Sequence, residues 1–376
     1  MKMSLGRALA LAAVPTLLVA LGQGVASARP ASGSPPPTGF EAQSASFVSA
    51  RTGFVLGTRG CSILPCTALL EKTVNGGKTW TAVSAPAVSL VPRFTTSPAS
   101  AVSAVVFENA TDGWLLGPGL WATTDGGKKW HQVTAVPGEV IDLVAADGEV
   151  FASAEPTSGG LLKARLYESR VGGSKWTWVK KVTPLNLLTV FGHSVWAGSA
   201  NGVTPALWTS TDSGKHWSRL SFRCPQGELT ASGVAAASAS DVTIACSDES
   251  YPHPGESYKE VFTSSNGGRT FHLVAKWSQV PVAGQVYGLA MAAGNPKVIT
   301  LNAASGASYL DQSTNGGKTW KQNAYLDGGL GFNDLAYVSA TTGYVIHFYG
   351  TPVIATSDGL MKTVNAGKTW TTVTIP

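Results

Sequence analysis

The stretch Thr73-Val74-Asn75-Gly76-Gly77-Lys78-Thr79-Trp80 carries the chemistry of a tight hairpin turn, and its pattern occurs seven times in the 376 residues. Asn and Asp tolerate left-handed backbone angles and accept hydrogen bonds from the amides just ahead, glycine supplies a positive φ, and a Ser or Thr hydroxyl caps a further amide. The aromatic residue then opens the return strand. The third and eighth positions of the seven copies are Asn75 and Trp80, Asp125 and Trp130, Val171 and Trp176, Asp212 and Trp217, Asn266 and Phe271, Asn315 and Trp320, and Asn365 and Trp370.

The spacing of this turn motif indicates the architecture. Its closing aromatic residues are 50, 46, 41, 54, 49 and 50 residues apart. Strand-like pairs such as residues 46–49 and 53–57 precede each motif, and a third and a fourth strand flank it, so every period supplies four strands. Four strands repeated seven times predict an all-β fold, a single seven-bladed β-propeller. The predicted blades span residues 42–86, 87–137, 138–184, 185–225, 226–281, 282–325 and 326–376.

The N-terminal residues are typical of targeting and spacer sequence. Two basic residues precede an apolar run of 14 residues, 8–21, and Ala26-Ser27-Ala28 supplies a small-residue cleavage site, which predicts a secretory signal peptide over residues 1–28. An uncleaved membrane anchor is the alternative, but a spanning helix needs about 20 apolar residues. Residues 29–41 are rich in Pro, Ser and Gly and predict a flexible leader. We therefore expect a secreted protein with no membrane span after cleavage.

The composition argues against several classes of protein. Only 13% of the residues are charged, and 43 are glycine, which disfavours a helix bundle, a coiled coil or an acidic disordered chain. The 27 Lys and Arg against 22 Asp and Glu give a net charge of +5, and no cluster of Lys and Arg stands out along the sequence. We therefore expect neither nucleic acid nor an anionic membrane surface as a partner. We also expect a monomer.

The turn motif, Ser/Thr-x-Asp/Asn-x-Gly-x-x-Trp, resembles the Asp-box, or bacterial neuraminidase repeat, and Val171 is the one break at its acidic or amide position. The phrase before it, apolar-x-Phe/Tyr-Val-Ser followed by Gly-Phe/Tyr-Val, is similar to the photosystem II stability/assembly factor-like propellers. This resemblance covers about residues 42–376 and implies the propeller fold. It implies no single activity, because the Asp-box occurs in sialidases, xyloglucanases, sortilin-type receptors and non-enzymatic assembly factors.

The position of the turn motif within a blade distinguishes two faces of the ring. The turn between the third and fourth strands lies opposite the loops that join strands two and three, so the seven motifs share one face as structural hairpins. The other face, which we call the loop-rich face, receives the long and variable loops, where binding residues concentrate. Our candidate binding residues there are Arg59, Arg93, Asp248, Glu249, Tyr251, His253, Glu256, Tyr258, Glu260 and Tyr349.

Residues 246–260 form the most polar of these loops, with four carboxylates, two tyrosines and one histidine in 15 residues. A contact with a ligand or cation is one interpretation, and a solvated loop tip is the other. A sialidase would need three arginines to clamp a carboxylate, and a tyrosine nucleophile with a glutamate partner. The residues that such a site would use are Arg59, Arg93, Arg223, Tyr258 and Glu260. Nothing in their spacing compels a catalytic site, so we assign no catalytic residue.

Four cysteines in a chain expected to be secreted favour two disulfides over a metal site. Three pairings of Cys61, Cys66, Cys224 and Cys246 are possible. The plausible set joins Cys61 to Cys66 within one loop and Cys224 to Cys246 at the start of the fifth unit, because both pairs map to the loop-rich face. The sequence contains no metal-binding, phosphate-binding or nucleophile-elbow motif. We expect neither a metal nor a cofactor.

These features favour a secreted, non-catalytic binding or scaffold protein that recognises a protein or a glycan through its loop-rich face. A secreted sialidase-like glycoside hydrolase and a cell-envelope assembly factor are the alternatives. The sequence also leaves two ways to close the ring. The first and last blades pack together, or a strand from residues 40–46 crosses to the last blade.

Overall fold

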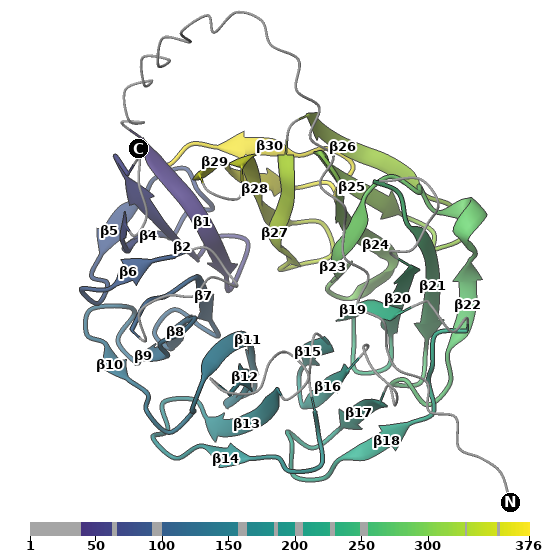
Figure 1. Ribbon diagram of the computed structural model, residues 1–376, viewed down its shortest axis with the longest axis horizontal. Helices are drawn as coiled ribbons and strands as arrows, with labels where there is room; N and C mark the ends of the chain where they lie inside the picture. The colour runs from purple at the N-terminus through teal and green to yellow at the C-terminus, as the bar shows by residue number, and fades with distance from the viewer. Residues whose placement is uncertain are drawn as a thin grey trace, which may run out of the picture. The chain divides into compact units, whose positions relative to one another are not determined.

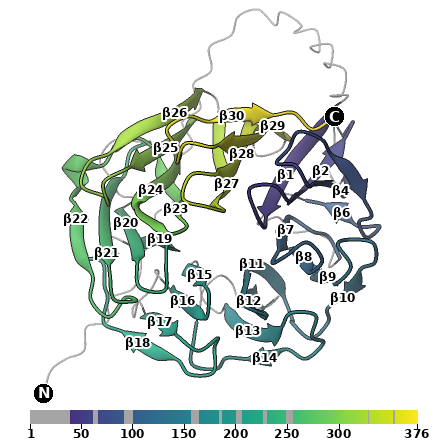
Figure 2. The same ribbon diagram turned by 180° about the vertical axis from the view of Figure 1, so that it is seen from behind.

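The computed structural model describes residues 39–61, 66–91, 100–156, 164–183, 187–199, 206–225, 230–248, 255–327, 329–351 and 354–376. These residues belong to the compact unit Pro36–Pro376. Within this unit, seven four-stranded antiparallel sheets follow one another around a ring (Figure 1, and Figure 2 from behind). The all-β, seven-bladed propeller predicted from the sequence is therefore confirmed.

In each blade the strands run in chain order from the middle of the ring outward (Figure 1). Blades 1 to 4 consist of β1 (Phe40–Phe47), β2 (Gly53–Arg59), β4 (Leu69–Thr73) and β5 (Thr81–Val83); β7 (Ala104–Phe107), β8 (Gly113–Leu116), β9 (Trp121–Thr123) and β10 (His131–Gln132); β11 (Glu139–Ala146), β12 (Glu149–Glu155), β13 (Arg165–Arg170) and β14 (Thr177–Trp178); and β15 (Leu187–Phe191), β16 (Ser194–Ser199), β17 (Ala206–Ser210) and β18 (Ser218–Leu220). Blades 5 to 7 consist of β19 (Thr230–Ala236), β20 (Val242–Asp248), β21 (Tyr258–Ser264) and β22 (His272–Ala275); β23 (Gln285–Ala292), β24 (Asn295–Ala304), β25 (Ala307–Ser313) and β26 (Lys321–Asp327); and β27 (Gly329–Tyr337), β28 (Gly343–Thr351), β29 (Ile354–Thr363) and β30 (Thr371–Val373). Two short strands, β3 (Cys66–Thr67) and β6 (Ser89–Leu90), pair separately, and a 3₁₀ helix, η2, covers Trp277–Gln279.

A serine or threonine hydroxyl organises the turn between the third and fourth strands in six of the seven blades. In blade 1 the Thr73 hydroxyl accepts the Gly77 amide at 2.9 Å and donates to Asn75 Oδ1 at 3.0 Å, and that Asn75 oxygen accepts a further amide at 2.9 Å. Blades 2, 4, 5, 6 and 7 repeat these bonds. In blade 3, where Val171 offers no side-chain acceptor, the Ser169 hydroxyl donates to backbone carbonyls instead.

The same turn lies against the first hairpin of its own blade. In every blade a backbone amide of the turn donates to a carbonyl at the hairpin between the first and second strands, as Gly76 does to Arg51 at 2.7 Å and Ala366 to Thr341 at 2.8 Å. The two hairpins therefore share one face of the ring, which we call the turn face. Because the strands of a blade are antiparallel, the loops between the second and third strands lie on the opposite, loop-rich face.

The apolar core lies between the blades rather than within one of them. Phe54 of blade 1 stacks on Phe107 of blade 2 with ring centroids 3.5 Å apart, and buried leucines of both blades pack around the pair. Each further pair of neighbouring blades shares an apolar cluster of this kind. Burial of apolar surface at these seams is the largest favourable contribution to the stability of the ring.

Blades 7 and 1 close the ring by packing. Strand β1 pairs with β2 in the first sheet, so the segment from residue 40 belongs to blade 1 and does not cross to blade 7. Phe47 stacks on Tyr344 with ring centroids 3.4 Å apart, and the Tyr344 hydroxyl donates to the Ala50 carbonyl at 3.0 Å. Lys362 Nζ donates to the Gly76 carbonyl at 2.9 Å across the same seam.

The first strand starts slightly earlier than the sequence indicates. Phe40 and Glu41, which the sequence analysis places in the leader, pair with Arg59 and Thr58 of β2. The Arg59 guanidinium carbon also lies 5.3 Å from the centroid of the Phe40 ring. Phe40 and Glu41 therefore belong to the first sheet and not to the leader.

Both disulfides have the expected pairing. Cys61–Cys66 closes the loop after β2, with its Cα atoms 6.0 Å apart, and Cys224–Cys246 ties the link after β18 to β20, with its Cα atoms 5.9 Å apart. Cys246 is fully buried in the cluster between blades 4 and 5. The second disulfide therefore joins two neighbouring blades.

Gly316 and Ala366 occupy the same position of the turn in blades 6 and 7, with φ of 74° and 60°. A Cβ atom is disfavoured at such angles, whereas glycine is not. We expect Ala366→Gly to raise the free energy of unfolding by about 0.5–1 kcal/mol and Gly316→Ala to lower it by about 1 kcal/mol. Urea unfolding measures both, and a change of the same sign in the two variants would contradict this geometry.

Candidate functional site

Four of the residues predicted from the sequence lie on β20, on β21 or just before β21, toward the loop-rich face of blade 5 (Figure 1). Asp248 ends β20 and lies opposite Tyr258, which begins β21. Glu256 forms a β-bridge with Ala283 in the link to blade 6. Glu260 follows Tyr258 by two residues on β21, so both side chains leave the same side of the strand. This is the side of Phe262, which packs against blade 4. The blade 5 corner, as we call this group, consists of Asp248, Glu256, Tyr258, Glu260 and Trp277.

Trp277 completes the corner, and no motif in the sequence points to it. Its ring meets that of Tyr258 edge-on, with centroids 5.1 Å apart. Its 3₁₀ turn is fixed because the Gln279 side chain accepts the Lys276 amide at 2.9 Å. Of the twelve tryptophans only Trp178 and Trp277 are exposed, with 41% and 48% of their surface open to solvent. Both stand outside the turn motif, but so do the buried Trp114 and Trp196, so the sequence alone does not signal their exposure.

Backbone hydrogen bonds hold the link between blades 5 and 6 against the corner. The Ser257 amide donates to the Val282 carbonyl at 2.9 Å, and the Ser257 hydroxyl donates to the Gly284 carbonyl at 2.8 Å. The Gly284 amide donates in turn to the Gly255 carbonyl at 2.9 Å. Gly284 has a φ of 75°, and a Cβ there would lie 2.8 Å from the Ala304 amide nitrogen of blade 6. Glycine is therefore required for this close approach.

A buried ion pair lies beneath the link. Lys259 of β21 and Asp311 of β25 are both buried, with Nζ and Oδ2 3.8 Å apart. Lys259 Nζ also donates to the carbonyls of Pro281 at 2.6 Å and Ala283 at 2.7 Å. Burial lowers the pKa of Lys259, and the charge of Asp311 opposes that shift. Burial likewise raises the pKa of Asp311, against the charge of Lys259. The lysine thus joins blade 5, blade 6 and the link between them.

The corner is acidic and aromatic in character. Burial raises the pKa of Glu260, and the charge of Lys276 partly offsets the shift. The Oε2 atom of Glu260 is buried and has no hydrogen-bond partner among the described residues. Carboxylates that share a corner with aromatic rings favour a cation or a hydrogen-bond donor over an anion. The arrangement is therefore suited to holding a ligand group of that kind.

The arginines that a sialidase would bring together lie apart. Arg59, at the end of β2 in blade 1, donates to Glu71 Oε1 at 2.6 Å and to the Pro376 carbonyl, and it lines an open pocket of about 300 Å³. Arg223 follows β18 of blade 4, on the far side of the ring (Figure 1). These two arginines therefore do not converge on one carboxylate.

The remaining candidates lie elsewhere in the chain. Tyr349 is on β28 of blade 7, where its backbone pairs with Gly329 and Thr356, so it belongs to a different blade from the corner. The other predicted residues, Arg93, Glu249, Tyr251 and His253, lie outside the described residues.

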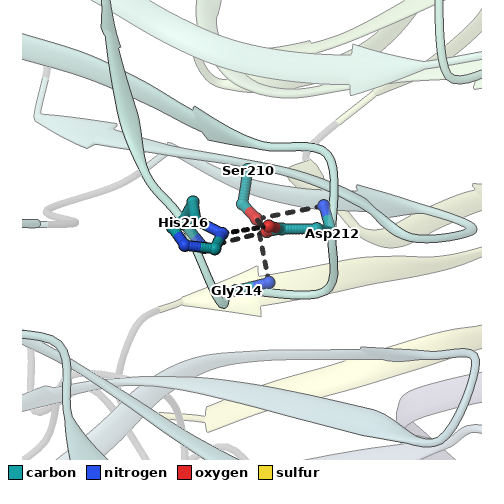
Figure 3. A network of polar contacts seen from close by, with 4 residues as sticks. All are labelled: Ser210, Asp212, Gly214 and His216. Atoms are coloured by element: carbon teal, nitrogen blue, oxygen red, sulfur yellow. Dashed lines mark hydrogen bonds and ion pairs between the residues drawn. The ribbon is translucent and has the colours of Figure 1, made fainter.

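Ser210, Asp212 and His216 have the three side-chain types of a hydrolase triad, yet they form the turn of blade 4 (Figure 3). The Ser210 hydroxyl donates to Asp212 Oδ1 at 2.8 Å and accepts the Gly214 amide at 2.9 Å, and His216 Nδ1 lies 2.5 Å from Asp212 Oδ2. Serine and histidine both bond to the carboxylate, so the histidine is not placed to take the serine proton. Hydrogen bonds from the His216 amide and ring lower the pKa of Asp212 to about 2. These residues stabilise a turn.

In the parts of the chain that the structure describes, no three His, Cys, Asp or Glu side chains are grouped to bind a metal ion. Nor does any helix in those parts have the length and apolar character needed to cross a membrane.

No protein-family model matches the sequence, and no curated protein matches it. Among solved structures, YCF48 bound to D1 peptide is 18% identical, over 88% of this chain and 94% of that one, with a TM-score of 0.53. YCF48 from Cyanidioschyzon merolae is 15% identical, over 88% and 96% of the two chains, with a TM-score of 0.54. The GH74 xyloglucanase from Xanthomonas campestris is 11% identical, over 88% of this chain and 60% of its own, with a TM-score of 0.51.

These likenesses show the fold alone, because the identities are low. The resemblance to photosystem II assembly factor-like propellers is confirmed at the level of the fold. The same ring occurs in a protein bound to a peptide and in a xyloglucanase. The activity of this chain therefore has to be argued from its side chains.

Replacement of Lys259 by methionine would leave Asp311 buried without its cation, and we expect it to cost about 3 kcal/mol in the free energy of unfolding. Adding Asp311→Leu removes the unpaired carboxylate, so the double variant is expected to recover part of that loss. Denaturant unfolding of both single variants and the double variant measures the coupling. If the double variant lost as much free energy of unfolding as the two single variants together, the result would contradict the pairing of Lys259 with Asp311.

Proposed function

We propose that this protein is an extracytoplasmic, non-catalytic propeller that binds a segment of a partner protein at the blade 5 corner. The observation that carries the proposal is the exposed Trp277 ring set against Tyr258, with the Glu260 carboxylate on the same side of β21 as Tyr258. Exposed tryptophan and tyrosine with polar neighbours are the residue types that dominate the binding energy of protein interfaces.

The way the corner is built also supports binding. Hydrogen bonds of Ser257 and Gly284 and the buried ion pair of Lys259 fix β21 and the link beside it, which carry the corner. A surface that is already in place loses little conformational entropy when a ligand arrives. Its carboxylates suit a partner segment that carries lysine or arginine, whose cation would lie near Glu260 while its apolar groups cover Trp277.

The comparisons and the disulfides agree with this proposal. YCF48, which shares the fold, has been solved with a D1 peptide, so this type of ring is able to hold a peptide. Two disulfides favour an oxidising compartment, as does the predicted signal peptide. These features support a role as a scaffold or assembly factor in the cell envelope. The hydrolase alternative loses support because Arg59 and Arg223, which a sialidase would bring together on one carboxylate, lie apart on blades 1 and 4.

The test is co-purification from the envelope fraction of the native host, with the full chain as bait. We expect a partner protein that remains bound to the wild type and is reduced at least tenfold by Trp277→Ala and by Tyr258→Ala. Trp178→Ala is the matched control, because Trp178 is exposed to a similar extent on blade 3, and it should retain the partner. Equal recovery with all variants, or hydrolysis of sialosides that depends on Tyr258, would refute the proposal.

A further inference from the structure

The excess positive charge of this chain is concentrated in one part of the ring. Residues 164–225, which include the outer strands of blade 3 and the whole of blade 4, contain eight Lys and Arg against two Asp and Glu. Their net charge is +6, whereas the whole chain carries +5. The stretch is continuous in the sequence, and the fold places its strands on two consecutive blades.

Trp178 lies within this positively charged region. It ends β14, the outermost strand of blade 3, and pairs with Tyr167 of β13. The Arg165 guanidinium carbon lies 4.7 Å from the centroid of the Trp178 ring, and Lys180 Nζ lies 6.0 Å from it. Lys180 and Lys181 are both exposed. The cations of Arg165 and Lys180 therefore lie over the indole ring, which keeps 41% of its surface open to solvent. In the outer strands of the other blades no tryptophan is present.

Blade 4 extends this surface. Strand β18 follows β14 along the outer edge of the ring in both views (Figures 1 and 2). An open pocket of about 510 Å³ is lined by Arg219 of β18 and by the residues after it, including Phe222 and Arg223. Both arginines are exposed. The basic rim, as we call this surface, consists of Arg165, Trp178, Lys180, Lys181, Arg219 and Arg223.

We propose that the basic rim binds an acidic polysaccharide, a chain of sugar rings that carry carboxylates. One side of a pyranose ring presents C–H groups, and these pack well on a flat indole ring. The guanidinium and ammonium groups around Trp178 pair with carboxylates. The pocket beside Arg219 and Arg223 has room for a further sugar unit, so one polysaccharide chain can contact both blades.

A single exposed indole favours this partner over other polyanions. Proteins that bind single-stranded nucleic acid stack successive bases on several aromatic rings, and proteins that lie on anionic membranes insert several apolar side chains. The described part of the rim offers Trp178 alone as an exposed large apolar side chain. The rim thus offers one indole on which a sugar can stack and cations spread over two blades. This spacing suits a polysaccharide, whose carboxylates are separated by sugar rings.

Calorimetric titration of the full chain with polygalacturonate fragments at low salt tests the proposal. We expect Trp178→Ala to weaken binding at least tenfold. We expect Lys180→Gln with Lys181→Gln to weaken it and to flatten its dependence on salt, because fewer ion pairs form. The controls are Trp277→Ala and the double variant Lys318→Gln with Lys321→Gln. Their three altered side chains are exposed on blade 6 and on the link that precedes it, and these controls should bind within twofold of the wild type.

Three probes complete the experiment: neutral dextran, a single-stranded DNA oligonucleotide and phosphatidylglycerol vesicles. The proposal is supported if polygalacturonate binds more tightly than all three. Binding to DNA or vesicles at equal or higher affinity would overturn it, as would unchanged affinity in the Trp178 variant. If urea unfolding shows that the Trp178→Ala variant is not folded without denaturant, the double variant Lys180→Gln with Lys181→Gln decides the outcome. Because Trp178 and Trp277 lie on different blades, failure here leaves the proposed function of the corner unaffected.

Discussion

Each blade of this ring can bury its two apolar faces only against the blade before it and the blade after it. The second strands show this most clearly, because nearly every residue of β2, β12 and β20 is buried, whichever side of the sheet it faces. A single blade would therefore expose apolar surface on both sides, and the seven become stable only as a closed ring. The stacking of Phe47 on Tyr344 and the bond from Lys362 to Gly76 show that the closing seam is built like the others.

In the turns, the residue at the third motif position determines which hydrogen bonds form with the residue four positions on. In four blades an Asn side chain donates from Nδ2 to a Thr hydroxyl four residues on, each time at 2.8 Å. Where Asp replaces Asn, the residue four positions on is Lys129 or His216, whose amide bonds to the carboxylate. The residue at the third motif position and the residue four positions on thus change together, from Asn with Thr to Asp with Lys or His. This chemistry occupies the turn face, and the two binding surfaces that we propose lie elsewhere, at the loop-rich face of blade 5 and on the outer strands of blades 3 and 4.

The sequence supported the fold well because the turn motif acts through residues close together in the chain. Its hydroxyl, amide and glycine lie within eight residues, so their roles follow from local chemistry. The Lys259–Asp311 pair joins residues 52 positions apart in two blades, and no local pattern signals it. The charge of the basic rim is readable in the sequence as the excess of Lys and Arg over residues 164–225, but the placement of cations over an exposed Trp178 ring is a property of the folded chain. Trp277 has no such local signal, because Trp114 and Trp196 also stand outside the motif and are buried.

The two exposed tryptophans thus mark two surfaces with different chemistry, an acidic aromatic corner at Trp277 and a basic rim at Trp178. The central claim is that a partner protein docks on the loop-rich face at the corner. Site-specific photo-crosslinking in the native envelope tests it most directly, with a benzophenone amino acid placed at position 277 or at position 364, an exposed valine in the blade 7 turn. The account predicts a discrete protein adduct from position 277 and none from position 364. The same adduct from both positions, or an adduct from position 364 alone, would contradict it.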